Sequence, residues 1–200
     1  MTKKYLDQVY KLKTTRQTRN FYKDWSSTYD RELFENGYIT PIRCANALAS
    51  MQINKQDPII DIGCGTGLSG KAFRDKGFTK VDGSDFSSEM LRIADSKKVY
   101  RHLTLSTDEK PLNFDKNIYF HAAAVGVFSP LHASPKMIEE MLKVSKIGCF
   151  FVFSLNDHAL ANPQYEDKIR YLSDSGIAKV VFKEYGEHLP KIELGAMIYV

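Results

Sequence analysis

From residue 58 onward, the chain alternates between short strand-like stretches and longer stretches in which apolar residues recur every three or four positions. The strand-like stretches lie at 58–62, 80–85, 100–105, 118–125 and 149–154. Between them the helical spacing is clear in 137–142, where Met, Ile, Met and Leu fall on one face. Alternation of strands with amphipathic helices predicts a mostly parallel sheet with helices on both of its faces.

The C-terminal part of the pattern departs from this alternation. Two further strands are expected at 177–184 and 192–200, joined by a short loop through Pro190. A connection this short cannot cross over the sheet, so the two strands must be antiparallel. We therefore expect one α/β domain over residues 1–200, a doubly wound three-layer sandwich with a seven-stranded, mostly parallel sheet whose last strand is antiparallel.

Residues 1–56 precede the first strand and show helical features. Thr40-Pro41 predicts a helix start, with Thr40 as the N-cap and Pro41 at the first helical position, where its missing N–H is not needed. Upstream, aromatic residues are dense between Phe21 and Tyr29. We expect residues 1–56 to form a helical cap or lid on the domain rather than a separate domain.

The first strand is followed by a glycine-rich turn. Asp61 lies near the end of the strand, and Gly63, Gly65 and Gly67 let the backbone of the turn approach a ligand closely. A helix is predicted over 66–76, so its N-terminus, with free N–H groups, points at whatever fills the turn. The arrangement indicates a site for a nucleotide-type cofactor.

Two cofactors compete for this turn. Gly65, Gly67 and Gly70, with Asp85 twenty residues after Gly65, satisfy the fingerprint of dinucleotide-binding proteins. However, the carboxylate of Asp61 would repel a pyrophosphate and attract an ammonium group, such as the methionyl ammonium of S-adenosylmethionine (SAM). An antiparallel terminal hairpin is also not normal in dinucleotide-binding domains. Both observations favour SAM.

The acidic residue and the three alternating glycines resemble motif I of the class I SAM-dependent methyltransferases. The resemblance covers roughly residues 20–200 and is nearest to the quinone-biosynthesis type and to the Williams–Beuren-region and repeat-associated predicted methyltransferases. It implies a Rossmann-like methyltransferase fold, SAM as cofactor and methyl transfer as activity. Lys146-Ile147-Gly148-Cys149 stands where the family usually has Lys-Pro-Gly-Gly, a departure that concerns the subfamily more than the cofactor turn.

The resemblance also implies which side chains contact the cofactor. Trp25 and Tyr29, in the family's aromatic N-terminal motif, would lie over it. Asp85 would accept hydrogen bonds from both ribose hydroxyls, and Phe86 and Met90 would flank the adenine. The full set of expected cofactor contacts is Trp25, Tyr29, Asp61, Gly63, Cys64, Gly65, Thr66, Gly67, Asp85, Phe86, Met90, Thr107, Asp108, Ala124 and Val125.

Methyl transfer needs no side-chain nucleophile, but a hydroxyl or amine acceptor can need a base. Open α/β sheets bind ligands beyond the carboxyl ends of their strands. His132 and His158 follow the fourth and fifth strands and are the expected catalytic bases. His121 is expected to be a hydrogen-bonded core residue, and neither His102 nor His188 is given a role.

The acceptor is expected to be a small molecule. The sequence contains no Asn-Pro-Pro-aromatic motif of amide or adenine methylation, no paired-Glu loop of arginine methylation and no cysteine positioned for pyrimidine C5 chemistry. Two alternatives stay open. One is a nucleic-acid methyltransferase, suggested by basic residues near the N-terminus, and the other is a protein that binds the cofactor without catalysis.

The net charge of +4 is concentrated at the N-terminus, where residues 1–24 carry seven Lys or Arg against two Asp. The same segment has an apolar helical face, so a solvated amphipathic helix is favoured over a nucleic-acid handle. Cys44, Cys64 and Cys149 are far apart, which predicts a reducing compartment, no disulfide and no metal site. No apolar run has the length of a membrane span, and we expect a cytoplasmic monomer or homodimer.

Overall fold

The computed structural model describes residues 5–6, 8, 15–107, 112, 118–129 and 133–200. Its helices are α1 (Thr15–Trp25), α2 (Tyr29–Glu35), α3 (Thr40–Ala49), α4 (Leu68–Asp75), α5 (Ser88–Ser96), α6 (Lys136–Val144), α7 (Asp157–Leu160) and α8 (Gln164–Asp174), with a 3₁₀ turn η2 (Pro190–Ile192). Its strands are β1 (Ile59–Ile62), β2 (Val81–Asp85), β3 (Leu103–Leu105), β4 (His121–Phe128), β5 (Phe150–Asn156), β6 (Lys183–Leu189) and β7 (Leu194–Tyr199).

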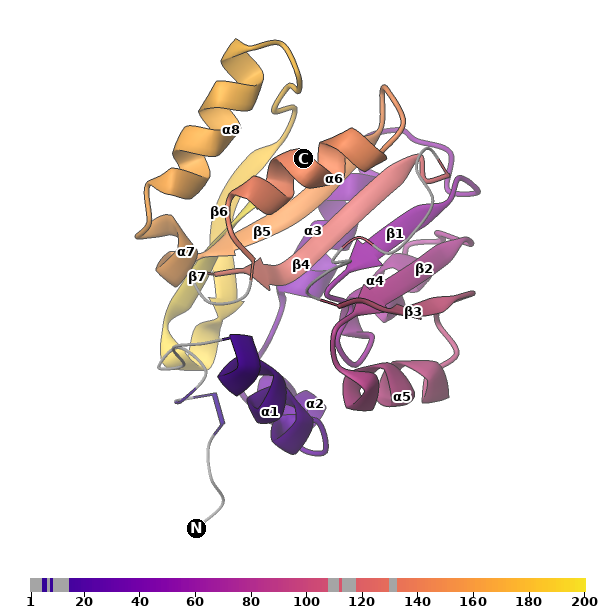
Figure 1. Cartoon of the computed structure of the whole chain (residues 1–200), viewed down its shortest axis with the longest axis vertical. Helices are drawn as coiled ribbons and strands as arrows, with labels where there is room; N and C mark the ends of the chain where they lie inside the picture. The colour runs from indigo at the N-terminus through magenta and orange to yellow at the C-terminus, as the bar shows by residue number, and fades with distance from the viewer. Residues whose placement is uncertain (1–4, 7, 9–14, 108–111, 113–117, 130–132) are drawn as a thin grey trace.

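The strands form a seven-stranded sheet in the order β3-β2-β1-β4-β5-β7-β6 (Figure 1). The pairs among β1 to β5 are parallel, and β7 is antiparallel to both of its neighbours, β5 and β6. The short turn through η2 makes this orientation necessary, because it leaves no room for a crossover. The expected fold class and the antiparallel last strand are thus confirmed.

The sheet is covered on both faces, as its apolar central strands require. On β4, Ala123 and Val125 pack toward α3 and α4, in a core with Leu48 and Phe73. The alternate residues of β4, with Ala124 among them, pack toward α6 and α8. Because successive side chains of a strand point to opposite faces, a run of small and apolar residues in β4 serves both cores at once.

The predicted start of the sixth strand is wrong. The sequence predicts a strand over 177–184, but β6 spans Lys183–Leu189, with Lys183 opposite Tyr199 of β7. Ile177, Val180 and Val181 are instead 54%, 37% and 48% exposed. These apolar residues line a groove beside the sheet rather than a strand within it, and apolar character alone does not distinguish the two positions.

The expected N-cap role of Thr40 is also wrong. Helix α3 begins at Thr40 itself, and Ile39 occupies the cap position without a side-chain hydrogen bond. The Thr40 hydroxyl lies 2.7 Å from Nδ1 of His188, far away in the sequence. The Thr40 hydroxyl therefore bonds to the distant His188 ring rather than, as the sequence suggested, to a backbone N–H of its own helix.

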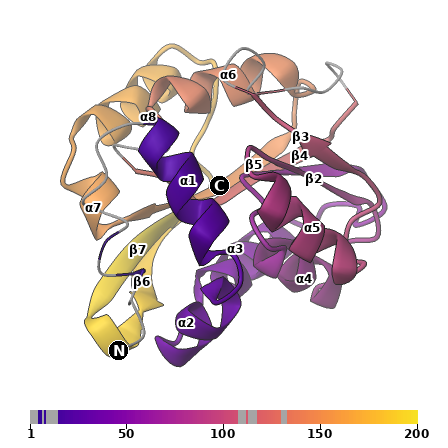
Figure 2. The same cartoon turned by 60° about the horizontal axis from the view of Figure 1, so that its bottom comes forward.

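Helices α1 and α2 lie at the edge of the sheet where its parallel strands end, here called the carboxyl edge (Figure 1). Seen from that side, α1 crosses in front of the sheet (Figure 2). The β6–β7 hairpin turns at the same edge, where the Ile39 N–H donates to the carbonyl of His188 at 3.2 Å. No described helix has the length and apolar character needed to cross a membrane.

Candidate functional site

The glycine turn between β1 and α4 has the left-handed backbone that favours glycine. Gly63, Gly65 and Gly67 have φ angles of +65°, +52° and +92°. A Cβ atom on Gly65 would meet nothing within 4 Å, whereas one on Gly63 would come within 2.5 Å of the Val127 side chain. The turn therefore packs tightly at its start and is open at Gly65, where a ligand can approach the backbone.

Asp61 is fully buried behind this turn. Its Oδ2 accepts hydrogen bonds from the Ser69 hydroxyl at 2.6 Å and from the Tyr100 hydroxyl at 2.7 Å. Its Oδ1 is buried with no hydrogen-bond partner. Burial raises the pKa of Asp61 to about 7, against the lowering effect of its two hydroxyl donors. The site therefore holds an unsatisfied acceptor that a cationic group would stabilise.

Tyr100 also explains the third glycine of the dinucleotide-like spacing. A Cβ atom on Gly70 would lie 2.3 Å from the Tyr100 ring, and the Gly70 N–H donates to the Tyr100 hydroxyl at 3.0 Å. Gly70 is thus needed for the close approach of an aromatic ring that supports Asp61, and the spacing does not require a pyrophosphate. Sequence reasoning missed Tyr100, because it follows α5 and gives no local signal of its contact with β1 and α4.

Asp85, at the end of β2, links the turn to the next helix. One carboxylate oxygen accepts the Gly65 N–H at 2.8 Å, and the other accepts the Ser87 N–H at 2.9 Å. The Ser87 hydroxyl in turn caps α5 by accepting the Met90 N–H at 3.2 Å, as the sequence predicted. With Asp61, this gives two buried carboxylates around one turn, an environment that favours a cation over a phosphate.

The N-terminal aromatic residues pack over this edge. Trp25 is 1% exposed, and its ring centroid lies 4.6 Å from that of Tyr29. One oxygen of Asp30, beside Tyr29, accepts the Thr66 hydroxyl at 2.5 Å, and the other pairs with Lys97 at 2.5 Å. The cap is therefore bonded directly to the glycine turn and to the residue that follows α5.

Two small cavities adjoin each other here and share Tyr29 and Tyr38. The first, of about 20 Å³, is lined by the turn residues Gly63, Cys64, Gly65 and Thr66, with Leu68, Ser69, Pro41 and Val125. The second, of about 40 Å³, is lined by Gly126, Asn156 and His188, with Leu6, Tyr22, Trp25, Leu33 and Leu189. The ends of β4, β5 and β6 thus supply polar groups next to the turn.

His188 is the functional candidate that sequence reasoning did not assign. It is 4% exposed, its Nδ1 is bonded to Thr40, and burial lowers its pKa to about 4. At neutral pH the ring is therefore uncharged and can accept a proton. A signal existed in the sequence: a strand antiparallel to the last one must end at the carboxyl edge, and His188 is the last residue but one of that strand.

The remaining residues that the sequence predicts for the site do not all lie at the glycine turn. Phe86 meets Tyr22 edge to face at 5.9 Å between centroids, and Met90 is buried. Thr107 is exposed, and Ala124 packs on the α6 and α8 side of the sheet. Asp108 and His132 lie outside the described residues.

Of the remaining histidines, His158 is exposed on α7 and lines neither of the two cavities. The expectation that His121 is hydrogen-bonded is wrong, since neither ring nitrogen has a partner although the residue is only 5% exposed. Among the residues that the structure describes, no three His, Cys, Asp or Glu side chains are grouped to hold a metal ion.

Residues 59–148 match the protein family described as a methyltransferase domain. A human protein, methyltransferase-like protein 27, is 27% identical over 161 residues, which span 79% of this chain and 65% of the relative, less than two thirds of its length. Magnesium protoporphyrin IX methyltransferase from Synechocystis PCC 6803, solved with bound SAM, has a TM-score of 0.65 and 16% identity, covering 94% of this chain and 97% of that one. A SAM-dependent methyltransferase from Thermotoga maritima has a TM-score of 0.62 and 13% identity, covering 91% and 98%.

At such identities the solved structures establish the fold, and the family match covers the strands and helices that build the glycine turn. The family resemblance read from the sequence is therefore confirmed, while the narrower subfamily stays a prediction. Residues 59–148 thus match the methyltransferase domain family, and the chain has the fold of solved SAM-dependent methyltransferases.

Proposed function

We propose that the chain transfers a methyl group from SAM to a small-molecule acceptor. The observation that carries this proposal is the adjacency of two cavities, one at the glycine turn and one lined by His188, which share Tyr29 and Tyr38. At about 20 and 40 Å³ both cavities are too small for the reactants, so the aromatic cap over them must move to admit SAM and the acceptor. Once opened, two subsites that share a wall would hold the reactants in contact and aligned, as in-line transfer requires.

Residues of this chain fit the cofactor. The turn at Gly65 and the unsatisfied carboxylate of Asp61 suit the methionyl end, directly or through water, and Asp85 suits the ribose. Phe86 and Met90 suit the adenine. When bound, SAM supplies a methyl group on a positively charged sulfur. The protein's contribution is to hold this group beside the acceptor and to keep water out of the site.

We propose His188 as the base that receives the acceptor's proton, because it lines the second cavity. In the tautomer that donates Nδ1–H to the Thr40 hydroxyl, Nε2 carries the free lone pair of the ring, and burial, which lowers the pKa of His188, keeps the ring uncharged at neutral pH. His132 and His158 remain candidates from the sequence. The geometry favours His188 because it lines the cavity that adjoins the glycine turn.

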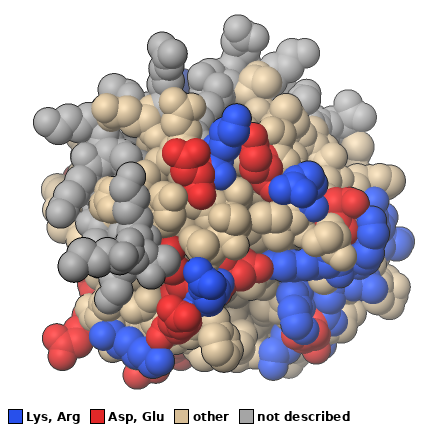
Figure 3. All heavy atoms as spheres, turned by 90° about the horizontal axis from the view of Figure 1, so that it is seen from below, with Lys and Arg blue, Asp and Glu red and all other residues tan. Residues whose placement is uncertain are grey.

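A small acceptor is favoured over a nucleic acid by the surface at the same edge. On the face seen in Figure 3, Lys and Arg are gathered toward one side, with Asp and Glu among them. Ion pairs such as Lys71–Asp75 and Lys98–Asp95 reduce the charge that these lysines offer to a phosphate backbone. We further propose a single domain capped by residues 1–56, and a cytoplasmic location, which three free thiols support.

The acceptor can be found with methyl-labelled SAM. The purified chain is incubated with the labelled cofactor and with fractions of a cell extract, and the labelled product is identified by mass. Label in a small-molecule fraction supports the proposal. Label in nucleic acid points to the first alternative, and SAM binding without transfer to any fraction points to the second, a non-catalytic binding protein.

Replacement of Asp85 by Ala should weaken SAM binding at least about tenfold, because a hydrogen bond to a charged group contributes roughly 1.5–3 kcal/mol. The variant also loses the anchor that holds Gly65 and Ser87 in place. Calorimetry with SAM measures the effect. Asp95→Ala, which removes an exposed carboxylate on the following helix α5, is the matched control. Unchanged affinity in Asp85→Ala, or tight binding of NAD by the parent, would refute the assignment.

The affinity for SAM should rise as the pH is raised from about 6 to about 7.5, since Asp61, with a pKa of about 7, must ionise to attract an ammonium group. The Asp61→Asn variant should bind SAM weakly, with an affinity that depends little on pH. In the protein without SAM, the raised pKa of Asp61 has the opposite effect on the stability of the fold. The folded chain keeps a proton on Asp61 up to a pH of about 7, whereas the unfolded chain releases it at the usual pKa of 3.8. The free energy of unfolding should therefore fall as the pH rises from 3.8 to about 7. Calorimetric titrations and thermal unfolding across this range test both signs. A flat affinity profile in the parent would contradict the role given to Asp61.

A further inference from the structure

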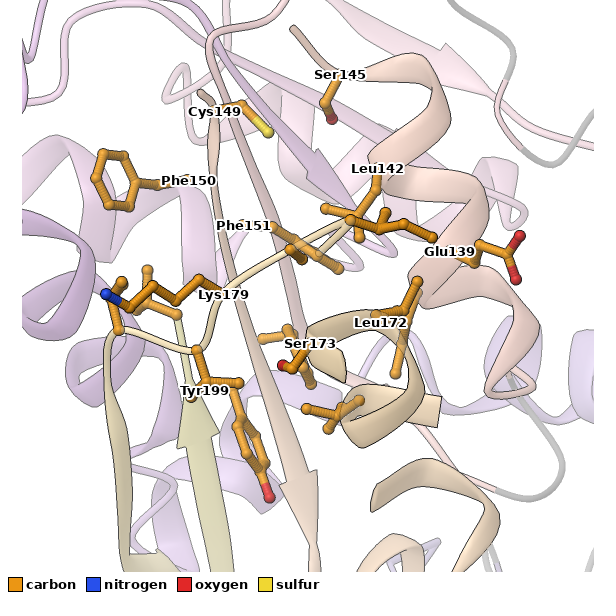
Figure 4. A pocket seen from close by; sticks show the side chains of 18 of the residues that line it. Glu139, Leu142, Ser145, Cys149, Phe150, Phe151, Leu172, Ser173, Lys179 and Tyr199 are labelled. Carbon is orange, nitrogen blue, oxygen red and sulfur yellow. The ribbon is translucent and has the colours of Figure 1, made fainter. Parts of the chain in front are cut away.

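A groove of about 930 Å³ lies on the other side of the molecule from the glycine turn. It is formed by α6, α8, the start of β5 and the segment that leads from α8 to β6 (Figure 4). The residues before β5 and β6, and the end of the antiparallel β7, all lie at the edge where the parallel strands begin. The groove is therefore separate from the cofactor turn and from the His188 cavity, which lie at the carboxyl edge.

The walls of the groove are apolar. Leu142 of α6, Phe151 of β5 and Leu172 of α8 point into the same space (Figure 4). The open side is formed by the segment between α8 and β6, where Ile177 and Val181 are about half exposed. A hollow of this size falls within the roughly 300–1,000 Å³ of small-molecule sites, and its exposed apolar surface would be stabilised by a ligand.

The charges on the lining are not balanced. Lys143, Lys146 and Lys179 line the groove together with Glu139. Glu139 is already paired, with Lys143 at 2.6 Å and with Lys168 at 3.0 Å. Within the described part of the chain, no carboxylate forms an ion pair with Lys179 or with Lys146, whose ammonium group lies 3.7 Å from the Phe120 ring centroid.

The positive charge of Lys179, unpaired within the described residues, lies at one side of the groove. Lys179 and the neutralised Glu139 lie on opposite sides of the groove (Figure 4). The site thus combines an apolar hollow with positive charge at one side, and the matching ligand has an apolar body and one anionic end. A neutral hydrocarbon would leave Lys179 unused, and a dianionic polar metabolite would leave the apolar walls in water.

We propose that this groove binds an aliphatic carboxylate of the fatty-acid type, with its chain between α6 and α8 and its carboxylate at Lys179. Lys146 adds a second positive charge on the lining. The ligand site does not depend on methyl transfer, because it shares no residue with the glycine turn or with the cavity of His188.

Binding is tested with dodecanoate, which displaces a fluorescent fatty acid from the purified chain. We expect a dissociation constant on the order of 10 μM, and binding at least about tenfold weaker for dodecanol, which has the same chain without the charge. Ala178→Trp, which fills the groove from the segment after α8, should weaken dodecanoate binding at least about tenfold. Lys179→Glu should weaken it by about the same factor, since it replaces an attraction by a repulsion.

The control is the Lys76→Glu variant. Lys76 is an exposed lysine after α4, on the opposite face of the sheet, so this variant should bind dodecanoate as the parent does. An unchanged affinity for SAM shows that each variant is folded. Equal affinity for dodecanol and dodecanoate, or parental dodecanoate binding by Ala178→Trp, would overturn the proposal. Self-association of the parent that Ala178→Trp abolishes would also overturn it, in favour of a second copy of the chain.

Discussion

Removal of residues 1–30 should lower the rate of methyl transfer about a thousandfold at saturating SAM, because a loss of alignment by one ångström already reduces rates by about a hundredfold. The deleted segment contains Trp25 and Tyr29, which pack over the turn, and Asp30, which holds Thr66 and Lys97. Without it, the turn loses its hydrogen-bonded cover and the site opens to water. The rate is measured with the acceptor found by methyl labelling.

The sheet should stay folded in this truncated chain, since its two main cores are built from α3, α4, α6 and α8. Circular dichroism and hydrogen exchange of β4 check this. In the full chain, SAM should selectively protect residues 20–30 from exchange. Phe34→Ala, which removes a side chain that is 84% exposed on α2, should leave the rate unchanged. A truncated protein that binds SAM and transfers methyl groups like the parent would show that the aromatic residues only seal the edge.

His188→Gln should lower kcat about a hundredfold with little change in the affinity for SAM, as expected for the loss of a general base. Glutamine keeps a side chain that can bond to Thr40, so the hairpin and the start of α3 are retained. The amide cannot take up the acceptor's proton at neutral pH. Steady-state kinetics with the identified acceptor separate kcat from KM, and calorimetry gives the affinity for SAM.

His158→Gln and His132→Gln, measured in the same assay, compare the bases expected from the sequence with the one found in the structure. Thr40→Val removes only the partner of Nδ1, and a smaller loss than in His188→Gln would identify Thr40 as a positioning residue. A kcat within twofold of the parent in His188→Gln, with a large loss in His158→Gln, would transfer the role to α7.

The features that sequence reasoning located correctly are those with a local physical cause. The strand before Asp61, the glycines that need positive φ and the Ser87 cap of α5 each involve residues within a few positions of one another. The antiparallel orientation of β7 follows from the length of one turn. These features are enough to define the fold and the kind of cofactor site.

The features that were missed depend on residues far apart in the sequence. Tyr100 supports Asp61 across 39 residues, and His188 bonds to Thr40 across 148. Neither contact leaves a trace in the periodicity of its own segment. The expected bases in the loops after β4 and β5 were chosen by sequence position alone, which does not say where a loop side chain points. The start of β6 was misplaced for a related reason, because an apolar residue facing a groove resembles one facing a core.

The strand order divides the two halves of the proposed reaction between two parts of the sheet. Asp61 and Asp85, assigned to the donor, lie at the ends of β1 and β2, whereas Gly126, Asn156 and His188 lie on β4, β5 and β6. The two groups meet at a single seam, where Asp61 of β1 pairs with Ala123 of β4. A change in side-chain packing along this seam would therefore change the distance between the methyl group and the acceptor. Substitutions that repack the seam should therefore alter turnover more than either affinity.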